Sequence, residues 1–227
     1  MNDDVRPEMP RWVDLALTII MALAAVGTAW AGFQSAKWSG LQAIAFAEAG
    51  AARTESAKAS TDAGQDRLAD TVTFTSWLEA LQQEIVAGTS PRPQGDYTPN
   101  DEELSGFLYE RFRPEFKPAV DAWIATQPLI DPDAPATPFE MPEYTLESDA
   151  RAASLVEEAE ASTQEAHDDN QRSDNYVFMA VILALALFFA GVAGRSRTLR
   201  SQYLLSIAAT VTFVGAAIVL LVLPKTF

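Results

Sequence analysis

Three long apolar stretches dominate the hydrophobic pattern of this chain. They cover residues 12–33, 176–193 and 203–223, and the second and third contain no charged residue. At a rise of about 1.5 Å per residue, roughly 20 helical residues cross the hydrocarbon core of a bilayer. The pattern predicts three transmembrane helices, one near the N-terminus and a pair near the C-terminus, with a long polar insert between them.

The first part of the insert, residues 34–86, is rich in alanine and contains few helix breakers, so it predicts one long helix that continues the first span. Small residues recur along it at steps of three and four, which favours close contact with another helix. The predicted contact face consists of Leu41, Ala45, Ala49, Ala52, Ser56, Ala59 and Ala63, and it continues as Leu68, Val72, Thr75, Leu78 and Ile85.

The middle of the insert has the composition of a small irregular tip. Residues 88–100 are rich in proline and glycine, Pro114 and Pro118 divide an aromatic stretch into short helices, and residues 127–144 contain five prolines. Residues 145–175 again predict a helix, and no proline separates them from the second span.

The predicted fold is an all-α membrane protein in which a long antiparallel helical hairpin with a small helical tip is inserted between the first and second spans. Its segments are an N-terminal segment 1–11, span 12–33, outgoing stem 34–86, tip 87–144, return stem 145–175, span 176–193, basic loop 194–202, span 203–223 and tail 224–227.

Charge predicts the orientation. The loop between the last two spans carries Arg195, Arg197 and Arg200 without an acidic residue, and such loops stay in the cytoplasm. The N-terminus is then cytoplasmic as well, and residues 34–175 are extracytoplasmic. Lys225 in the tail is a single charge against this placement.

Composition excludes several classes of protein. Residues 34–175 hold 27 Asp and Glu against 10 Lys and Arg, a net charge of −17, which repels the phosphates of nucleic acids. The chain has no cysteine, which excludes disulfides, thiolate catalysis and cysteine-ligated zinc. It has one histidine and no motif that pairs a nucleophile with a base, so we expect neither an enzyme nor a bound cofactor.

The first span has a rival interpretation as a cleaved signal peptide, because Ala29-Trp30-Ala31 follows an apolar run. The run is long, the segment before it is acidic, and the small-residue pattern continues as helix. These features favour an uncleaved signal anchor.

Two stretches, WAGFQSAKWSGLQA (residues 30–43) and DNYVFMAVILALALFFAGVAGRSRTLR (residues 174–200), resemble a family of bacterial three-span membrane proteins known only as a domain of unknown function. The resemblance implies a location in the bacterial inner membrane. It implies no activity, ligand or functional residue.

The first span contains the one acidic residue of the three spans, and this residue lies on a face of small side chains. That face consists of Asp14, Thr18, Ala25, Thr28 and Gly32. Acids inside membranes often mark ion pathways, and Asp14 repeated in a symmetric oligomer forms a ring at a pore mouth. The alternative is an interfacial aspartate that the helix dipole stabilises, or a face that contacts other helices.

Aromatic residues give a second candidate site, a partner-binding patch on the tip. Its members are Phe107, Phe112, Phe116 and Trp123. The alternative is that these side chains form the hydrophobic core of the tip itself.

Two acidic groups are candidate metal sites. His167 has Glu165, Asp168 and Asp169 beside it, but consecutive positions on a helix point apart. A second group, Asp62, Asp66 and Asp70, shares one face at four-residue spacing. Both are more typical of solvated helix faces, so no metal site is expected.

The sequence therefore predicts a non-enzymatic, homo-oligomeric scaffold or partner-binding protein of the bacterial inner membrane. Its expected partners are the lipid bilayer, copies of itself and a further membrane or extracytoplasmic protein. The alternative is an ion channel or transporter subunit with the first span around the oligomer axis.

Overall fold

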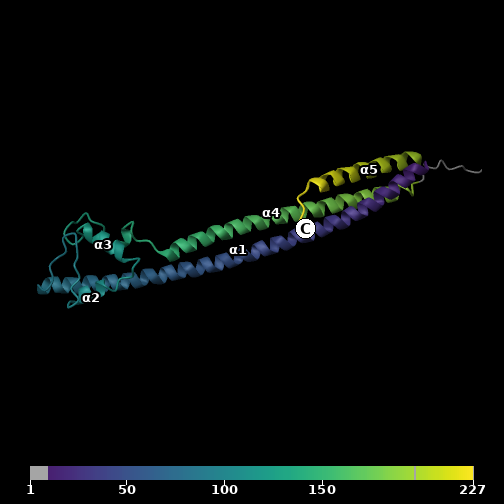
Figure 1. Cartoon of the computed structure of the whole chain (residues 1–227). Helices are drawn as coiled ribbons and strands as arrows, with labels where there is room; N and C mark the ends of the chain where they lie inside the picture. The colour runs from purple at the N-terminus through teal and green to yellow at the C-terminus, as the bar shows by residue number, and fades with distance from the viewer. Residues whose placement is uncertain (1–9, 197, 227) are drawn as a thin grey trace, which may run out of the picture. The chain divides into compact units, whose positions relative to one another are not determined.

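The computed structural model describes residues 10–196 and 198–226, and Figure 1 shows its elements. The described residues form helices and no strand. The elements are α1 (Arg11–Ala87), α2 (Leu104–Tyr109), α3 (Lys117–Ala125), the short 3₁₀ helix η1 (Pro138–Glu140), α4 (Glu147–Ala193) and α5 (Leu199–Val222). Three of them, α1, α4 and α5, contain segments long and apolar enough to cross a membrane.

Helix α1 passes without a break from the first apolar stretch into the alanine-rich stretch, and α4 likewise contains both the return segment and the second apolar stretch. Neither junction contains proline, so nothing in the backbone interrupts the hydrogen-bond ladder. Helix α1 ends before Gly88, whose φ of +77° is the left-handed conformation that commonly terminates helices.

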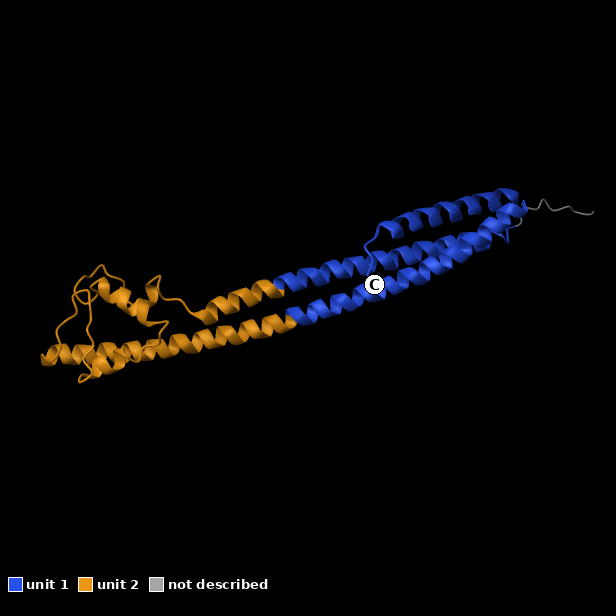
Figure 2. Cartoon of the chain, in the orientation of Figure 1, with its two compact units in different colours: residues 1–49, 160–227 blue, residues 50–159 orange. Residues whose placement is uncertain are grey.

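The chain divides into two compact units, which Figure 2 colours separately. Unit 1 consists of residues 1–49 and 160–227, and unit 2 of residues 50–159. In each unit α1 and α4 lie side by side, and their contacts pair in antiparallel order. In unit 1 the side chains of Ser35 and Ser173 are hydrogen-bonded. In unit 2 Ser56 donates a hydrogen bond to the carbonyl oxygen of Ala152.

Small side chains dominate the packing of unit 1. On α1, Ala24 and Ala31 are fully buried, and on α4 Ala186 and Ala190 are buried too. A Cβ added to Gly27 would lie 2.9 Å from Cδ1 of Leu183, so the end of this buried side chain would have to shift to admit it.

Many large apolar side chains of unit 1 are exposed. On the first apolar stretch of α1 they are Trp12, Leu15, Ile19, Leu23, Val26, Trp30 and Phe33. Only 17% of the most apolar window of α1 is buried within the chain. Such a surface is typical of helices that face lipid.

Unit 2 has an aromatic core that holds the tip on α1. Phe74, Trp77 and Leu81 of α1 pack with residues of the tip, among them Phe116 and Trp123. Trp77 and Phe116 are fully buried.

The buried face of α1 differs from the sequence prediction beyond Gly64. Ala45, Ala49, Ala52, Ser56, Ala59 and Ala63 are buried as predicted. Leu41 is exposed, and so are Leu68 and Val72, with 66% and 57% of their surface accessible. Thr75 is exposed as well, whereas Leu78 and Ile85 are partly buried against the aromatic core, as predicted. The tip covers Phe74, Trp77 and Leu81.

Candidate functional site

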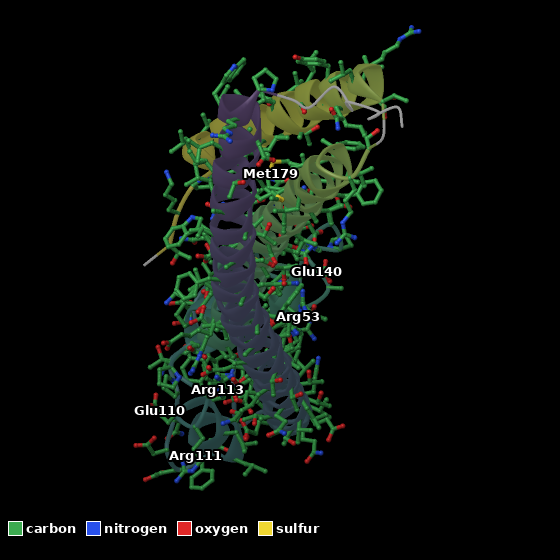
Figure 3. All side chains as sticks on the ribbon, turned by 90° about the vertical axis from the view of Figure 1, so that its right-hand side faces the viewer. Arg53, Glu110, Arg111, Arg113, Glu140 and Met179 are labelled. Carbon is green, nitrogen blue, oxygen red and sulfur yellow. The ribbon has the colours of Figure 1, made fainter. Side chains whose placement is uncertain are left out.

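Unit 2 contains a buried carboxylate that joins α1 to the tip. Asp70 on α1 is 1% exposed, and its Oδ2 accepts a hydrogen bond of 2.9 Å from Nη1 of Arg113. Figure 3 labels Arg113 among the side chains of the tip. The same oxygen accepts a second hydrogen bond, of 3.2 Å, from the hydroxyl of Tyr144. Nη2 of Arg113 lies 3.2 Å from Oδ2 of Asp66 and 2.6 Å from Oε2 of Glu115. One guanidinium thus links three carboxylates.

Burial has the largest effect on the pKa of Asp70. Removal from water raises the pKa of Asp70 above its ordinary value, although the Arg113 guanidinium and the Tyr144 hydroxyl act in the opposite direction. Burial and the neighbouring Asp70 charge raise the pKa of Tyr144. With its partners in place, Asp70 acts as a structural clamp for the tip.

A second buried carboxylate fixes the start of α2. Glu84 accepts hydrogen bonds from the backbone nitrogen of Ser105, at 2.8 Å, and from its hydroxyl. The Tyr97 hydroxyl lies 2.7 Å from the Ser105 hydroxyl. A Cβ on Gly106 would lie 2.0 Å from the carbonyl oxygen of Asn100, so this turn requires glycine. These groups satisfy one another's hydrogen bonds.

The structure places most of the predicted partner-binding patch inside the tip. Phe112, Phe116 and Trp123 are buried in the aromatic core, which agrees with the alternative weighed above. Phe107 alone of the four is exposed, at 44%, and the guanidinium carbon of Arg111 lies 3.3 Å from its ring centroid.

A polar cavity of about 280 Å³ lies on the surface of unit 2. Its lining consists of Glu55, Lys58, Ala59, Asp62, Asp66, Arg113, Glu115, Glu147, Ser148 and Arg151. Ion pairs already engage its side chains, because Arg151 binds Glu55 and Arg113 binds both Asp66 and Glu115. Across residues 10–196 and 198–226, no three His, Asp or Glu side chains are arranged to hold a metal ion.

The other acidic group that was weighed as a metal site lies on α4. The ring of His167 meets that of Phe46 edge to face at 5.9 Å, and Asp169 is buried beside Arg172.

The face predicted on the first span lies on the outside of unit 1. Asp14, Thr18, Ala25 and Gly32 are exposed, and Thr28 is partly buried. The hydroxyls of Thr18 and Thr28 donate to backbone carbonyls of their own helix, four residues back. Within one chain this face is therefore largely exposed.

A longer pattern, which the sequence analysis missed, extends this exposed face along α1. Ala, Gly and Thr recur at steps of three and four, and every one of these residues is exposed within its own unit. We call this set the outer seam: Thr18, Ala22, Ala25, Ala29, Gly32, Ala36, Gly40, Ala43, Ala47, Gly50, Thr54, Ala57, Thr61 and Gly64. A Cβ added to any of its four glycines meets nothing within 4 Å. The spacing is visible in the sequence, but alanines on every face of the helix hide it.

The basic loop caps the start of α5. The Thr198 side chain accepts a hydrogen bond from the backbone of Ser201, as expected of an N-cap. Arg195 and Arg200 are exposed on either side, and Arg197 lies outside the described residues.

Comparison with family models, with curated proteins and with solved structures finds no match to this chain.

Proposed function

We propose that the protein is a non-enzymatic, homo-oligomeric scaffold of the bacterial inner membrane. In this proposal α1, α4 and α5 span the bilayer, and residues 34–175 form an extracytoplasmic helical hairpin with an acidic tip. The exposure of the outer seam is the observation that carries the proposal.

The first span has three distinct faces, and only two of them have an occupant in a single embedded chain. Its buried face, with Ala24 and Ala31, packs inside unit 1. Its large apolar face, including Leu23 and Val26, suits lipid. The outer seam gives lipid little side chain to contact. In lipid, helix association depends on packing, and small residues let two backbones approach closely.

The buried small-residue face of α1 and the outer seam both follow heptad spacing, which supports a coiled-coil stem. Ala45, Ala52 and Ala59 are buried at seven-residue steps, and Ala43, Gly50 and Ala57 are exposed at the same steps. A seven-residue repeat favours left-handed supercoiling, so a second copy has a regular surface to follow.

Cysteine cross-linking tests the oligomer directly, because the natural chain contains no cysteine. Gly50→Cys and Ala57→Cys, each alone, should form disulfide-linked dimers in membranes. Glu48→Cys and Glu55→Cys, two exposed positions off the seam, serve as matched controls and should link at least 5-fold less. Equal linking at all four positions, or a strictly monomeric parent in mild detergent, refutes the proposal.

A second candidate function is an ion channel with α1 around the axis. Asp14 supports it, because this exposed acid lies one turn before Thr18 of the outer seam. Flux measured in liposomes distinguishes the two functions. A channel requires cation flux that Asp14→Asn reduces, whereas a scaffold gives no flux in either protein.

A further inference from the structure

Gln34 on α1 is fully buried at the end of the first apolar stretch, where the polar insert begins. Its amide makes two hydrogen bonds to one residue of the C-terminal tail. Nε2 donates to the carbonyl oxygen of Thr226 at 3.1 Å, and Oε1 accepts from the backbone nitrogen of Thr226 at 3.1 Å. A side-chain amide carries the same donor and acceptor as a peptide group, so it pairs with a backbone as a neighbouring strand would.

Tyr176 on α4 contributes a third contact from the opposite helix. It is also fully buried, and its hydroxyl donates to the carbonyl oxygen of Pro224 at 2.9 Å. Its ring belongs to an apolar cluster with Ala31 and Leu220, and Leu223 packs against that cluster. The tail thus lies over an apolar base, and all three of these hydrogen bonds go to its backbone.

The local sequence directs the tail to this position. Proline cannot continue a helix and biases the residue before it towards extended conformations. Leu223, before Pro224, accordingly has φ −58° and ψ 141° and ends α5. Nζ of Lys225 donates to the carbonyl oxygen of Leu221 at 2.9 Å, which satisfies one of the free carbonyls at the helix end.

We propose that Gln34 and Tyr176 form a recognition site for an extended peptide backbone, and that residues 224–226 of the same chain occupy it as a releasable strap. Helix α5 packs on α1 and α4 through small and apolar side chains such as Ala209 and Ala216. The strap adds directional contacts at one end and sets the position of the third apolar helix against the other two. Gln34 and Tyr176 bind backbone groups of the strap, so the side chain of Thr226 is interchangeable while its N–H and C=O are not.

A spin label on Lys225→Cys tests this proposal in the full chain in nanodiscs, with the mobile fraction of its spectrum as the readout. Lys225 is exposed, and the chain has no other cysteine. Gln34→Leu should raise the ratio of mobile to immobile label roughly 10- to 100-fold, because two buried hydrogen bonds are lost. Tyr176→Phe should raise it about 5-fold for one bond. Ser35→Ala, on the same turn of α1 but bonded to Ser173, is the control and should leave it unchanged.

Two substitutions at Thr226 separate backbone recognition from simple packing. Thr226→Val keeps the N–H and should leave the label immobile. Thr226→Pro removes the N–H and should raise the ratio of mobile to immobile label about 5-fold. If Gln34→Leu does not fold, Gln34→Glu, which keeps the acceptor and loses the donor, must still raise the mobile fraction. An unchanged spectrum in the folded Gln34 and Tyr176 variants, or equal spectra for Val and Pro at position 226, overturns the proposal.

Discussion

The clamp on Asp70 makes a quantitative prediction about the stability of the tip. Arg113→Met keeps much of the apolar stem of the side chain and removes the charge that faces Asp70. Losing one partner of a buried ion pair costs about 3–5 kcal/mol, since the other charge stays buried without compensation. Arg113 is 29% exposed, so solvent reaches the pair and the cost should fall to about 2–4 kcal/mol. For a domain of this size, that lowers the Tm of unit 2 by roughly 8–16 °C.

The pH dependence of this loss identifies its cause. Burial raises the pKa of Asp70 above the ordinary 3.8, so the folded state holds the proton more tightly than the unfolded chain does. Protonation of Asp70 therefore favours folding as the pH falls towards the acidic range. In Arg113→Met the opposing charge is gone and the effect is larger. The Tm difference from the parent should shrink between pH 7 and pH 4.5.

Thermal unfolding in nanodiscs measures both effects. Near-ultraviolet circular dichroism of the aromatic core around Trp77 and Trp123 monitors the unfolding. The matched control is Arg151→Met, because the pair of Arg151 with Glu55 is more than half exposed on both sides and should shift the Tm by less than 2 °C. Asp70→Asn combined with Arg113→Met should cost less than the sum of the two changes. A Tm loss below 3 °C for Arg113→Met, or a loss equal at both pH values, refutes the reasoning.

Three further predictions follow from burial. Trp77→Ala should destabilise unit 2 by about 3–5 kcal/mol, whereas Phe107→Ala should cost under about 1 kcal/mol. A Phe107 variant that loses a bound partner at unchanged Tm would therefore indicate a docking role for this side chain. Gly27→Leu should disrupt the fold of a single chain, because Leu183 lies 2.9 Å from the added Cβ. Gly32→Leu should leave each chain folded and abolish only its assembly, as measured by light scattering. The opposite pattern contradicts a role of the outer seam in assembly. Burial raises the pKa of Tyr97, Tyr109 and Tyr144. Absorbance at about 295 nm should therefore show these phenols ionising above their ordinary pKa. A normal titration of all tyrosines in the folded protein would show that the tip core is open.

Regular, long-range patterns were the part of the fold that sequence alone could predict. The apolar runs indicated three helices that are long and apolar enough to cross a membrane, and the prolines after Gly88 indicated an irregular tip. The buried face of α1 between Ala45 and Ala63 was also predictable, since its spacing is regular. The face beyond Gly64 was predictable only in part, because Leu78 and Ile85 pack against the aromatic core while Leu68 and Val72 lie exposed.

The candidate sites, too, could be predicted from the sequence only in part. The sequence picked out the aromatic residues of the tip but could not say whether Phe112, Phe116 and Trp123 face outward or inward. It also gave no reason to pair Gln34 with Thr226, which are 192 residues apart.

The sequence by itself determined the composition of each helix: which segments are apolar enough for a bilayer, where proline and glycine end a helix, and which residues are small enough for close approach. These are local properties, set by side-chain volume, polarity and backbone freedom. Only the tertiary structure decided which of several similar alanine faces is buried, that Arg113 meets Asp70, and that the tail returns to Gln34. An alanine-rich helix offers little contrast between its faces, so the tip and α4 select the buried face by covering it.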